Sequence, residues 1–580
     1  MSGRLCLSVV FVVSLASSVS AQWSPDPNVN TVVCDTSGSQ ELPKIALTSD
    51  GGCYISWFDT RAGAYRVYMQ RFTAQGVKQW GTNGLLISAN PQSTSLVDWD
   101  LAVDDSNNAI VVFTDTRNGS VINPFAYKIS PQGEFRWGAN GVQLSNATTV
   151  FQADPKVAVT TGGNCVIVWQ YGSSPNQVAM QRLSPTGVKQ WGNDPILISG
   201  PTGEHRWRPS VVASDSGSAI LLYAGFTGSA ISPQGYKLLT QKVSSTGTTI
   251  WADTVYALGN VAGFFVPKIF SDGNNGAIYV WHDQRSGANS TSYVQRFTTA
   301  GARLFPLNGS ASSTLSGRLH NDAWAAFDRA TGDTYLFWYE TDAAFQNVYG
   351  VYGQRFSPTG ARQWPDSGVA FKPLTPTTQP AFVRCFAKDS SAVVFYLQLV
   401  GTTTHVVKGF RTNRNGNLLW GGAIKDISSF VSGKGRLTGV LTAAGNSIVT
   451  WADNRQDGNG IYAQEVSFSG QLGSTTAVEE ITERVPTEFA LEQNYPNPFN
   501  PTTRIVFSIE SANGGSVEPA RVTLKVYDVL GREVATLVNA SLNPGKYAVT
   551  FDASKLSSGV YFYRFQAGER VSTRKMLFAK

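Results

Sequence analysis

Short runs in which apolar and polar residues alternate follow one another along this chain, and turn-forming residues separate the runs. The first complete set covers residues 44–47, 54–57, 68–72 and 84–88. Gly, Asp, Asn and Ser fill the breaks, for example at Ser49–Gly52. Runs of this kind predict strands joined by hairpins, and no stretch of this part of the chain has a helical period. We therefore expect an all-β fold built from four-stranded antiparallel units.

This set of strands recurs eight times between Ala21 and Gly473. The turn before the fourth strand contains a glycine in every copy, at Gly76, Gly133, Gly187, Gly247, Gly301, Gly360, Gly416 and Gly470. Successive glycines are 57, 54, 60, 54, 59, 56 and 54 residues apart. A fixed period of this length is typical of toroids and arrays, and four strands per period is the size of a propeller blade. The period predicts an eight-bladed β-propeller over residues 22–473.

An aromatic residue follows seven of these glycines by four positions: Trp80, Trp137, Trp191, Trp251, Phe305, Trp364 and Trp420. The eighth repeat lacks this residue, because Gly470 is followed by Gln471–Ser474. At the other end of the chain, Trp23 precedes Trp80 by 57 residues (80 − 23), which is the period of the array. We therefore expect the N-terminal strand to complete the last blade and to close the ring.

Composition and charge agree with this architecture and exclude some functions. Charged residues make up 15% and aromatic residues 12% of the 580 residues, which suits many short strands packed through Trp and Phe. The net charge of +6 is small for this length, and Lys and Arg do not form blocks. The sequence therefore predicts no binding of nucleic acid and no binding to an anionic membrane.

The first residues have the order of a secretory signal peptide. A positive charge at Arg4 precedes the apolar run Leu5–Leu15, and the small residues Val19–Ala21 follow. This order predicts a signal peptide over residues 1–21, and the run is too short to span a bilayer. A buried N-terminal helix is the alternative. No other apolar stretch approaches 18 residues, so we expect no transmembrane helix.

Cleavage after residue 21 would leave four cysteines, Cys34, Cys53, Cys165 and Cys385. Cys53 and Cys165 each lie four residues before a strand Trp, so they occupy equivalent places two blades apart, too distant for a disulfide. We expect buried free thiols, with a Cys34–Cys53 bridge left open. The four histidines fall in different repeats, and no paired CxxC is present. The sequence therefore predicts neither a metal site nor a cofactor.

The composition changes after Gly473. Residues 474–488 form a polar stretch with four glutamates and no strand pattern, which predicts a linker. The Pro- and Asn-rich segment Leu491–Thr503 follows. Alternating strands are then expected at Arg504–Ile509, Val522–Tyr527 and Val560–Phe565. Their spacing predicts a small immunoglobulin-like β-sandwich of roughly seven strands over residues 489–580.

This C-terminal module resembles the sorting domain of the type IX secretion system of Bacteroidetes-like bacteria. Four elements carry the resemblance: NYPNPFNP from Asn494, YDVLGR from Tyr527, LSSGVY from Leu556 and the basic end RKMLFAK from Arg574. The sorting-motif residues are Asn494, Tyr495, Pro496, Asn497, Pro498, Phe499, Asn500, Pro501, Gly531, Gly559, Lys575 and Lys580. The resemblance implies export by the Sec machinery, recognition by the type IX outer-membrane translocon, and a final place in the medium or on the outer surface of a Gram-negative cell.

A Trp-x-Asp-x-Arg motif, once with Phe in place of Trp, follows the second strand in four repeats. Its acidic and basic residues are Asp59 and Arg61, Asp115 and Arg117, Asp283 and Arg285, and Asp453 and Arg455. Repeat six has Glu340 and Asp342 instead. These loops emerge on one face of a propeller, where carboxylates could bind a cation or hydrolyse a glycan. We favour the alternative that each Asp pairs with its own Arg and fixes the loop.

Aromatic residues precede several of the innermost strands. They are Trp99, Trp207, Phe264–Phe265 and Trp324, and acids, amides and arginines lie beside them. We place all of them at nearly the same step of the blade, on the face that carries the Asp residues. Such rings could stack on a sugar or a peptide at the mouth of the central channel. Packing between blades is the alternative.

Three functions remain open at this stage. The leading hypothesis is a non-enzymatic exported propeller that binds a glycan or a protein at the cell surface. The second is a secreted polysaccharide hydrolase or lyase that uses carboxylates on the same face. The third is a structural surface or adhesion component. No GxSxG, phosphate loop or HExxH motif is present, and the Ser-Asp-Gly turns at Ser49 and Ser271 read as ordinary hairpins rather than sialidase-type Asp-boxes.

Overall fold

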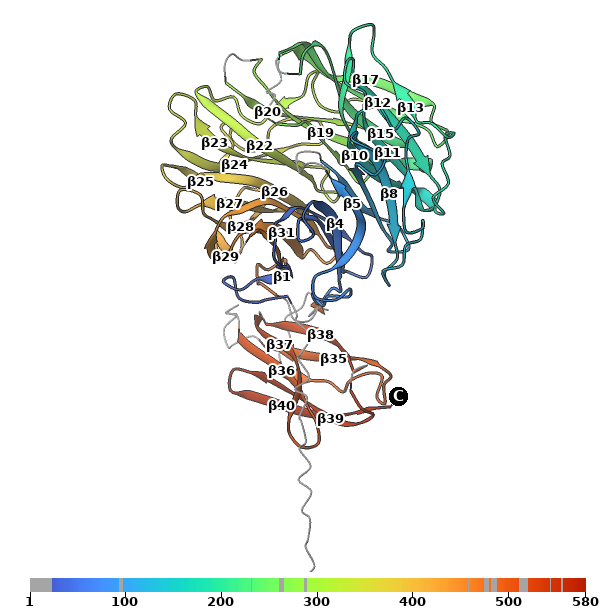
Figure 1. Cartoon of the computed structure of the whole chain (residues 1–580). Coiled ribbons are helices and arrows are strands. Elements are labelled where there is room, and N and C mark those ends of the chain that lie inside the picture. The colour runs from blue at the N-terminus through green and yellow to red at the C-terminus, as the bar shows by residue number, and fades with distance from the viewer. Residues whose placement is uncertain are drawn as a thin grey trace, which may run out of the picture.

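The expected strands are present in the computed structural model, and they form four-stranded antiparallel sheets (Figure 1). The structure describes residues 23–92, 98–230, 232–259, 265–285, 289–456, 458–473, 479–480, 488–510, 520–542, 544–553 and 556–579. The expected signal peptide, Phe264 and Lys580 lie outside these ranges. Two short 3₁₀ turns, η1 (Thr161–Gly163) and η2 (Asp215–Gly217), are the helical elements of the described part.

Eight of the sheets occupy the part of the chain between Thr31 and Val466. The first four are β2 (Gln40–Leu47), β3 (Cys53–Asp59), β4 (Tyr65–Phe72) and β5 (Leu85–Gln92); β6 (Asp100–Val103), β7 (Ala109–Asp115), β8 (Asn123–Ile129) and β9 (Val142–Gln143); β10 (Gln152–Thr160), β11 (Asn164–Tyr171), β12 (Gln177–Leu183) and β13 (Ile196–Ile198); and β14 (His205–Ala213), β15 (Ala219–Gly228), β16 (Pro233–Val243) and β17 (Thr249–Gly259).

The next three sheets follow the same order. They are β18 (Lys268–Ser271), β19 (Ala277–Asp283), β20 (Thr291–Phe297) and β21 (Ser310–Ala311); β22 (Arg318–Phe327), β23 (Thr334–Asp342), β24 (Tyr349–Phe356) and β25 (Val369–Thr375); and β26 (Pro380–Lys388), β27 (Ser391–Leu399), β28 (His405–Asn413) and β29 (Lys425–Ser432). The eighth consists of β30 (Lys434–Leu441), β31 (Ser447–Asp453), β32 (Gly460–Val466) and the N-terminal β1 (Thr31–Cys34). The two ends of the repeat array therefore meet in one sheet.

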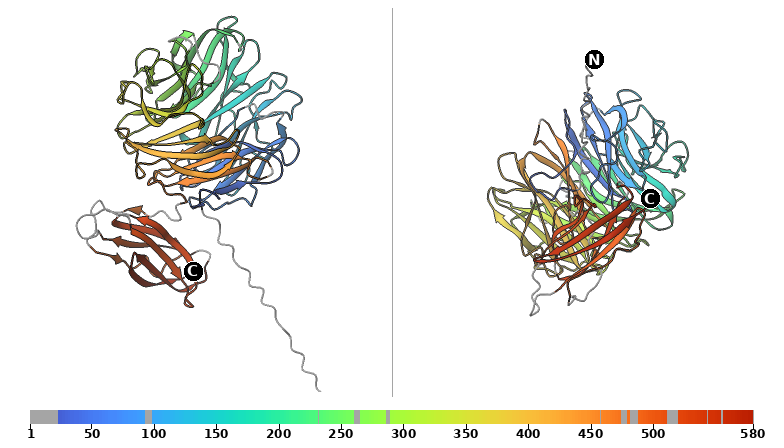
Figure 2. Two further views of the ribbon diagram at one scale, coloured as in Figure 1. Left: turned by 90° about the vertical axis from the view of Figure 1, so that its left-hand side faces the viewer. Right: turned by 90° about the horizontal axis from the view of Figure 1, so that it is seen from below.

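Every pair of neighbouring sheets shares a hydrophobic core cluster. The second strands are apolar along their length because both of their faces pack on a neighbouring sheet; β7 (AIVVFTD) is buried at every position. The clusters join each sheet to the next, and one that contains Trp23, Val33 and Trp57 joins the eighth sheet to the first. In Figure 2, the colours follow chain order around a ring, and the orange strands return beside the blue ones.

The repeated aromatic residue fastens each sheet to the next one. Trp80 Nε1 donates to the carbonyl of Pro131 in the following sheet at 3.1 Å. The same bond, of 2.9–3.0 Å, joins Trp137 to Pro185, Trp191 to Ser245, Trp251 to Thr299, Trp364 to Arg414 and Trp420 to Phe468. Trp23 donates to Ala74 O at 3.0 Å and lies on Gly76, where a Cβ would come within 2.6 Å of it. Trp23 therefore makes the contact between the eighth and first sheets for which the eighth repeat has no aromatic residue of its own.

Strands β34–β40 form a separate C-terminal unit of two sheets around one core (Figure 1). One sheet contains β33 (Glu479–Glu480), β38 (Gly545–Asp552), β35 (Thr502–Ile509) and β34 (Ala490–Leu491), and the other β37 (Glu533–Leu542), β36 (Ala520–Tyr527), β39 (Gly559–Ala567) and β40 (Arg570–Phe578). Seven of these strands, β34–β40, lie within residues 489–580, which agrees with the expected number of roughly seven. The expectation of a strand-free linker is wrong at β33, which pairs with Tyr547 and Ala548 of β38.

Candidate functional site

The loops of the eight-sheet ring lie on two faces. We call the face where β2 begins and β3 ends the loop face, because Gln40 pairs with Asp59 there. The opposite face carries the turns between first and second strands, and we call it the hairpin face. The antiparallel order is the same in every sheet, so the Asp motifs and the starts of all first strands share the loop face.

The repeated aspartates are buried and already paired. Asp59 accepts a hydrogen bond from Trp57 Nε1 at 2.9 Å and from the Arg61 backbone N–H at 2.8 Å, and it also pairs with the Arg61 guanidinium. The pairs Asp115–Arg117, Asp283–Arg285 and Asp453–Arg455 have the same form, each with a 2.6 Å contact. All four Asp side chains are at most 1% exposed. These carboxylates hold their loops and are closed to a ligand.

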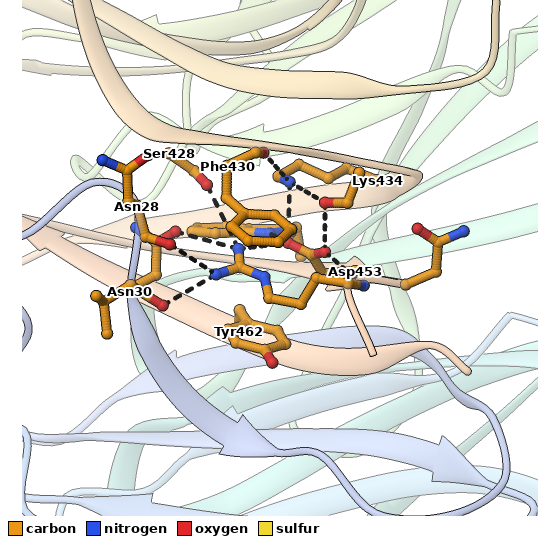
Figure 3. A network of polar contacts seen from close by, with 12 residues as sticks. Asn28, Asn30, Ser428, Phe430, Lys434, Asp453 and Tyr462 are labelled. Atoms are coloured by element: carbon orange, nitrogen blue, oxygen red, sulfur yellow. Dashed lines mark hydrogen bonds and ion pairs between the residues drawn. The ribbon is translucent and has the colours of Figure 1, made fainter. Parts of the chain in front are cut away.

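The Asp453 pair also ties the N-terminal segment to the ring (Figure 3). Arg455 donates to Val29 O at 2.9 Å and to Asn30 Oδ1 at 3.2 Å. Lys434 Nζ lies 3.0 Å from Asp453 Oδ2 and donates to Phe430 O at 2.7 Å. Burial lowers the pKa of Lys434 to about 8, against the attraction of Asp453. Two buried cations therefore share one buried carboxylate at the closure.

Repeat six departs from this pattern. Glu340 takes the place of the aspartate, accepts from Trp338 Nε1 at 3.1 Å, and lies 3.5 Å from both Arg318 Nε and His320 Nε2. Burial raises the pKa of Glu340 to about 7 and lowers that of His320 to about 3. Because Arg318 is 3.5 Å away rather than in close contact, Glu340 is a carboxyl group that can hold its proton near neutral pH.

The loop after Glu340 presents an exposed aromatic ring. Asp342 accepts hydrogen bonds from four backbone N–H groups, those of Phe345, Gln346, Asn347 and Val348, at 2.8–3.2 Å. These bonds fix the loop, while the Phe345 side chain is 81% exposed. Analysis of the sequence missed Phe345. The signal that could have found it is the presence of Glu340 and Asp342 where four other repeats have the Asp–Arg motif.

Trp99 does not face a ligand site, and that prediction is wrong. Its side chain is 0% exposed and stacks on Phe58 of the preceding sheet, with 5.0 Å between ring centroids. It belongs to the cluster that joins the first two sheets. The residue fills the space between sheets because it directly precedes β6, where the chain turns inward to begin the next sheet.

Trp207 and Phe265 are half-buried on the loop face. The Trp207 ring contacts Phe226 edge-on at 5.6 Å, and the Arg208 guanidinium lies 4.0 Å from its centroid. The Phe265 ring lies 4.6 Å from that of His282, whose Nε2 accepts the backbone N–H of Ala323 at 3.2 Å. Burial lowers the pKa of His282 well below its usual value.

Trp324 is also half-buried, and two cations lie close to it. The Arg384 guanidinium is 4.1 Å and Lys268 Nζ 5.4 Å from its ring. The prediction that the aromatic residues share nearly one step is wrong. Trp207 is the last paired residue before a bulge in β14, whereas Trp324 is the first paired residue after the equivalent bulge in β22. The two rings therefore stand at different depths of the first strands.

Charged side chains link the first strands of neighbouring sheets. Asp98 pairs with Lys44 of the preceding sheet at 2.6 Å and with Lys156 of the following one. Burial alone would raise the pKa of Asp98, but the two ammonium groups outweigh it and hold that pKa well below the usual value. Asp322 joins Lys268 and Arg384 in the same way, at 3.2 Å each. Each carboxylate thus connects three sheets.

The described residues contain no group of three or more His, Cys, Asp or Glu side chains arranged to hold a metal ion. Cys34, Cys53, Cys165 and Cys385 are buried free thiols. Burial is the main cause that raises the pKa of each thiol, to about 11 for Cys34 and about 12 for Cys165. They are therefore thiols rather than thiolates at neutral pH and are poor nucleophiles.

The sorting motif of the C-terminal unit is partly a core element. Phe499 is 2% exposed and stacks on Phe578 at 5.2 Å. Asn494 is 2% exposed, its backbone N–H donates to Tyr563 Oη at 2.8 Å and its Nδ2 to Thr503 Oγ1 at 2.9 Å. Tyr495 between them is 82% exposed. Pro496, Asn497, Pro498, Asn500 and Pro501 belong to the same segment, Gly531 lies in the β36–β37 turn, Gly559 begins β39 and Lys575 lies in β40.

Comparisons with known proteins identify the C-terminal unit. Residues 493–579 match the family model described as the secretion system C-terminal sorting domain. A search of curated proteins finds no match for the chain. The part of the chain that the structure describes has no helix with the length and hydrophobicity that a membrane span requires.

Solved structures resemble the chain only distantly. The polysaccharide lyase Uly1 is 10% identical, with a TM-score of 0.35 over 76% of this chain and 100% of its own. An endo-arabinase from Bacteroides thetaiotaomicron is 14% identical, with a TM-score of 0.27 over 46% of this chain and 96% of its own. An α-L-arabinofuranosidase from Clostridium thermocellum is 13% identical, with a TM-score of 0.26 over 45% and 92%. At these TM-scores we draw no functional inference from them.

The family match and the geometry of the motif apply to the C-terminal unit alone. This chain carries a secretion system C-terminal sorting domain over residues 493–579, which indicates secretion to the cell surface or the extracellular space.

Proposed function

We propose that the chain is an exported eight-bladed β-propeller that binds a glycan or a protein segment on its loop face. In this proposal residues 1–21 are a signal peptide, 22–473 the propeller, 474–488 a linker and 489–580 an immunoglobulin-like sorting module. The Sec machinery and the type IX translocon are its export partners. The eight sheets, the shared core clusters and the Trp23 fastening support the blade count.

The observation that carries the binding site is the pairing of half-buried tryptophans with guanidinium groups along the first strands, which begin at the loop face. Arg208 lies on Trp207, and Arg384 lies on Trp324. Such a pair offers a flat apolar surface beside hydrogen-bond donors, which suits a sugar ring or a peptide. Phe345 adds an exposed ring on a fixed loop of the same face. Because these groups are held by packing and hydrogen bonds, little ordering would accompany binding.

Hydrolysis or cleavage of a polysaccharide is the second candidate function. One observation favours it, because a carboxyl group with a raised pKa, such as Glu340, could act as a general acid. However, its side chain is only 1% exposed, and the four motif aspartates are buried in ion pairs. A substrate would have to displace Trp338 and Arg318 to reach it. Binding without catalysis therefore has the stronger support, and a structural or adhesion role would use the same binding surface.

A glycan array probed with the purified protein would identify a ligand, and calorimetry on variants would test the site. We expect Trp207→Ala and Trp324→Ala to weaken binding about 2- to 10-fold each, because ring stacking contributes roughly 0.5–1.5 kcal/mol. Trp191→Ala is the matched control, since this half-buried Trp fastens two sheets at the hairpin face. It should lower stability and leave binding unchanged. Wild-type affinity in both loop-face variants would reject the site.

A further inference from the structure

A cavity opens on the hairpin face, and its lining includes none of the aromatic residues described above. Its volume is about 720 Å³, within the range of ligand sites. Its lining comes from the first-to-second strand turns of four successive sheets: residues 271–273, 327–330, 387–389 and 441–443. The Ser271–Gly273 part is one of the Ser-Asp-Gly turns. The cavity therefore lies where the four turns converge.

Two of the carboxylates in the lining are already satisfied. Asp272 accepts from the Arg296 guanidinium at 2.9 and 3.1 Å and from the backbone N–H groups of Asn274 and Gly276 at 2.8 Å. Asp328 accepts the Ala330 and Ser390 backbone N–H groups at 3.0 and 2.8 Å. Both are at most 2% exposed, so neither offers its charge to the cavity.

Arg329 is the unpaired cation of this lining. Its side chain is exposed, and within the described part of the chain its guanidinium makes no hydrogen bond or ion pair. It lies directly on Gly273, where a Cβ would come within 1.9 Å of Arg329 Nε and 2.5 Å of Cζ. The guanidinium therefore fits here because residue 273 has no side chain. Its N–H donors form a planar fork that matches a carboxylate.

Other polar groups of the lining can form hydrogen bonds with the hydroxyl groups of a ligand. Asp389 is 62% exposed and lies 3.9 Å from Lys388 Nζ, so its carboxylate can accept hydrogen bonds. Ser271 Oγ and Thr442 Oγ1 each accept a backbone N–H at 3.0 Å, and each keeps an O–H to donate. The lining contains two large apolar side chains, Phe327 and Leu441. A ligand with one anionic group and several hydroxyls would use these partners.

We propose that this cavity is a binding site for an acidic saccharide, with the carboxylate of the sugar on Arg329 and its hydroxyls on Asp389, Ser271 and Thr442. The lining of this cavity includes none of Trp207, Trp324 and Phe345, so the proposal does not depend on the function proposed above.

Calorimetry on the full chain with trigalacturonate, neutral trigalactose and a pentaglutamate peptide tests the proposal. We expect trigalacturonate to bind and the other two to bind at least 10-fold more weakly. Arg329→Gln should weaken trigalacturonate binding about 10- to 100-fold, the usual effect of losing a charge-assisted hydrogen-bond pair. Arg329→Lys should have an intermediate effect, because it keeps the charge and loses the fork.

Gly273→Ala tests whether the position of the Arg329 guanidinium matters for binding, because the added methyl must displace Arg329. Gly51→Ala is the matched control, because no arginine lies on Gly51. The φ angles are +68° at Gly273 and +81° at Gly51, so both substitutions strain a hairpin turn. Binding should fall in the first variant and persist in the second. Equal binding of trigalactose or pentaglutamate, or unchanged binding in Arg329→Gln, would overturn the proposal.

Discussion

Removal of the Trp23 side chain is the most direct test of how the ring closes. The side chain is 0% exposed, its ring stacks on Phe72 at 5.2 Å, and its Nε1 donates to Ala74 O at 3.0 Å. Truncation of a buried Trp to Ala costs about 3–5 kcal/mol of the free energy of unfolding. Of this, the hydrogen bond accounts for about 1 kcal/mol. We therefore expect Trp23→Ala to destabilise the protein by about 3–5 kcal/mol.

Trp23→Phe separates the two contributions. Phe305 occupies the equivalent position and lies against Gly360 without an N–H group to donate, so the ring accepts Phe at this place. We expect Trp23→Phe to cost only about 1–2 kcal/mol, the hydrogen bond and a small loss of packing.

Urea denaturation followed by far-UV circular dichroism measures these changes on the purified protein. Trp80→Ala removes the equivalent bond to Pro131 between the first and second sheets. It should also destabilise the protein, but by less than Trp23→Ala, because Trp80 is only half-buried. Val188→Ala, at a 58% exposed position, should cost little. If Trp80→Ala destabilised the protein and Trp23→Ala did not, the N-terminal segment would not close the ring.

Three further predictions concern charge and export. Asp453→Ala should cost about 3–5 kcal/mol in the same denaturation assay, because it leaves the buried Lys434 without its counter-ion; an unchanged midpoint would contradict this role. Burial raises the pKa of Glu340 in the folded protein to about 7, above its usual value of 4.5, so its stabilising contribution is complete below pH 4.5 and disappears as the pH rises through 7. Relative to Glu340→Gln, the wild type should lose up to about 3 kcal/mol over that interval, and parallel pH profiles would refute the assignment. Deletion of Tyr495–Lys580 should leave the protein in the periplasm; fractionation that finds normal amounts outside the cell would contradict sorting by this domain.

Much of the fold followed from the sequence because the repeat states the same local pattern eight times. Each copy has its own apolar runs and its own turn glycine, so a strand that is ambiguous in one copy can be assigned by comparison with the other copies. The closure of the ring by the N-terminal strand could also be predicted, since Trp23 lies one period before Trp80. The sorting domain could be predicted for a similar reason, because each of its motif elements is a short continuous run of residues.

The candidate site was less predictable, because exposure depends on neighbours that are distant in sequence. Trp99 and Trp324 look alike in the chain, yet one is enclosed between two sheets and the other is half-exposed beside Arg384. Trp99 lies one residue before Asp100, which pairs with Val112, whereas Trp324 itself occupies the equivalent register opposite Phe337. The two rings are therefore one step apart, and side chains alternate between faces along a strand.

The hairpin-face cavity had no signal in the sequence at all. Gly273 and Arg329 are 56 residues apart (329 − 273) and belong to different sheets. Only the packing of the fifth sheet against the sixth brings the glycine under the guanidinium. Local hydrogen bonding and hydrophobic pattern determine strands and turns, so the sequence alone determined the repeat and its sorting tail. Contacts between neighbouring sheets depend on the curvature of the whole ring, so the tertiary structure alone decided which charges and rings are free to meet a ligand.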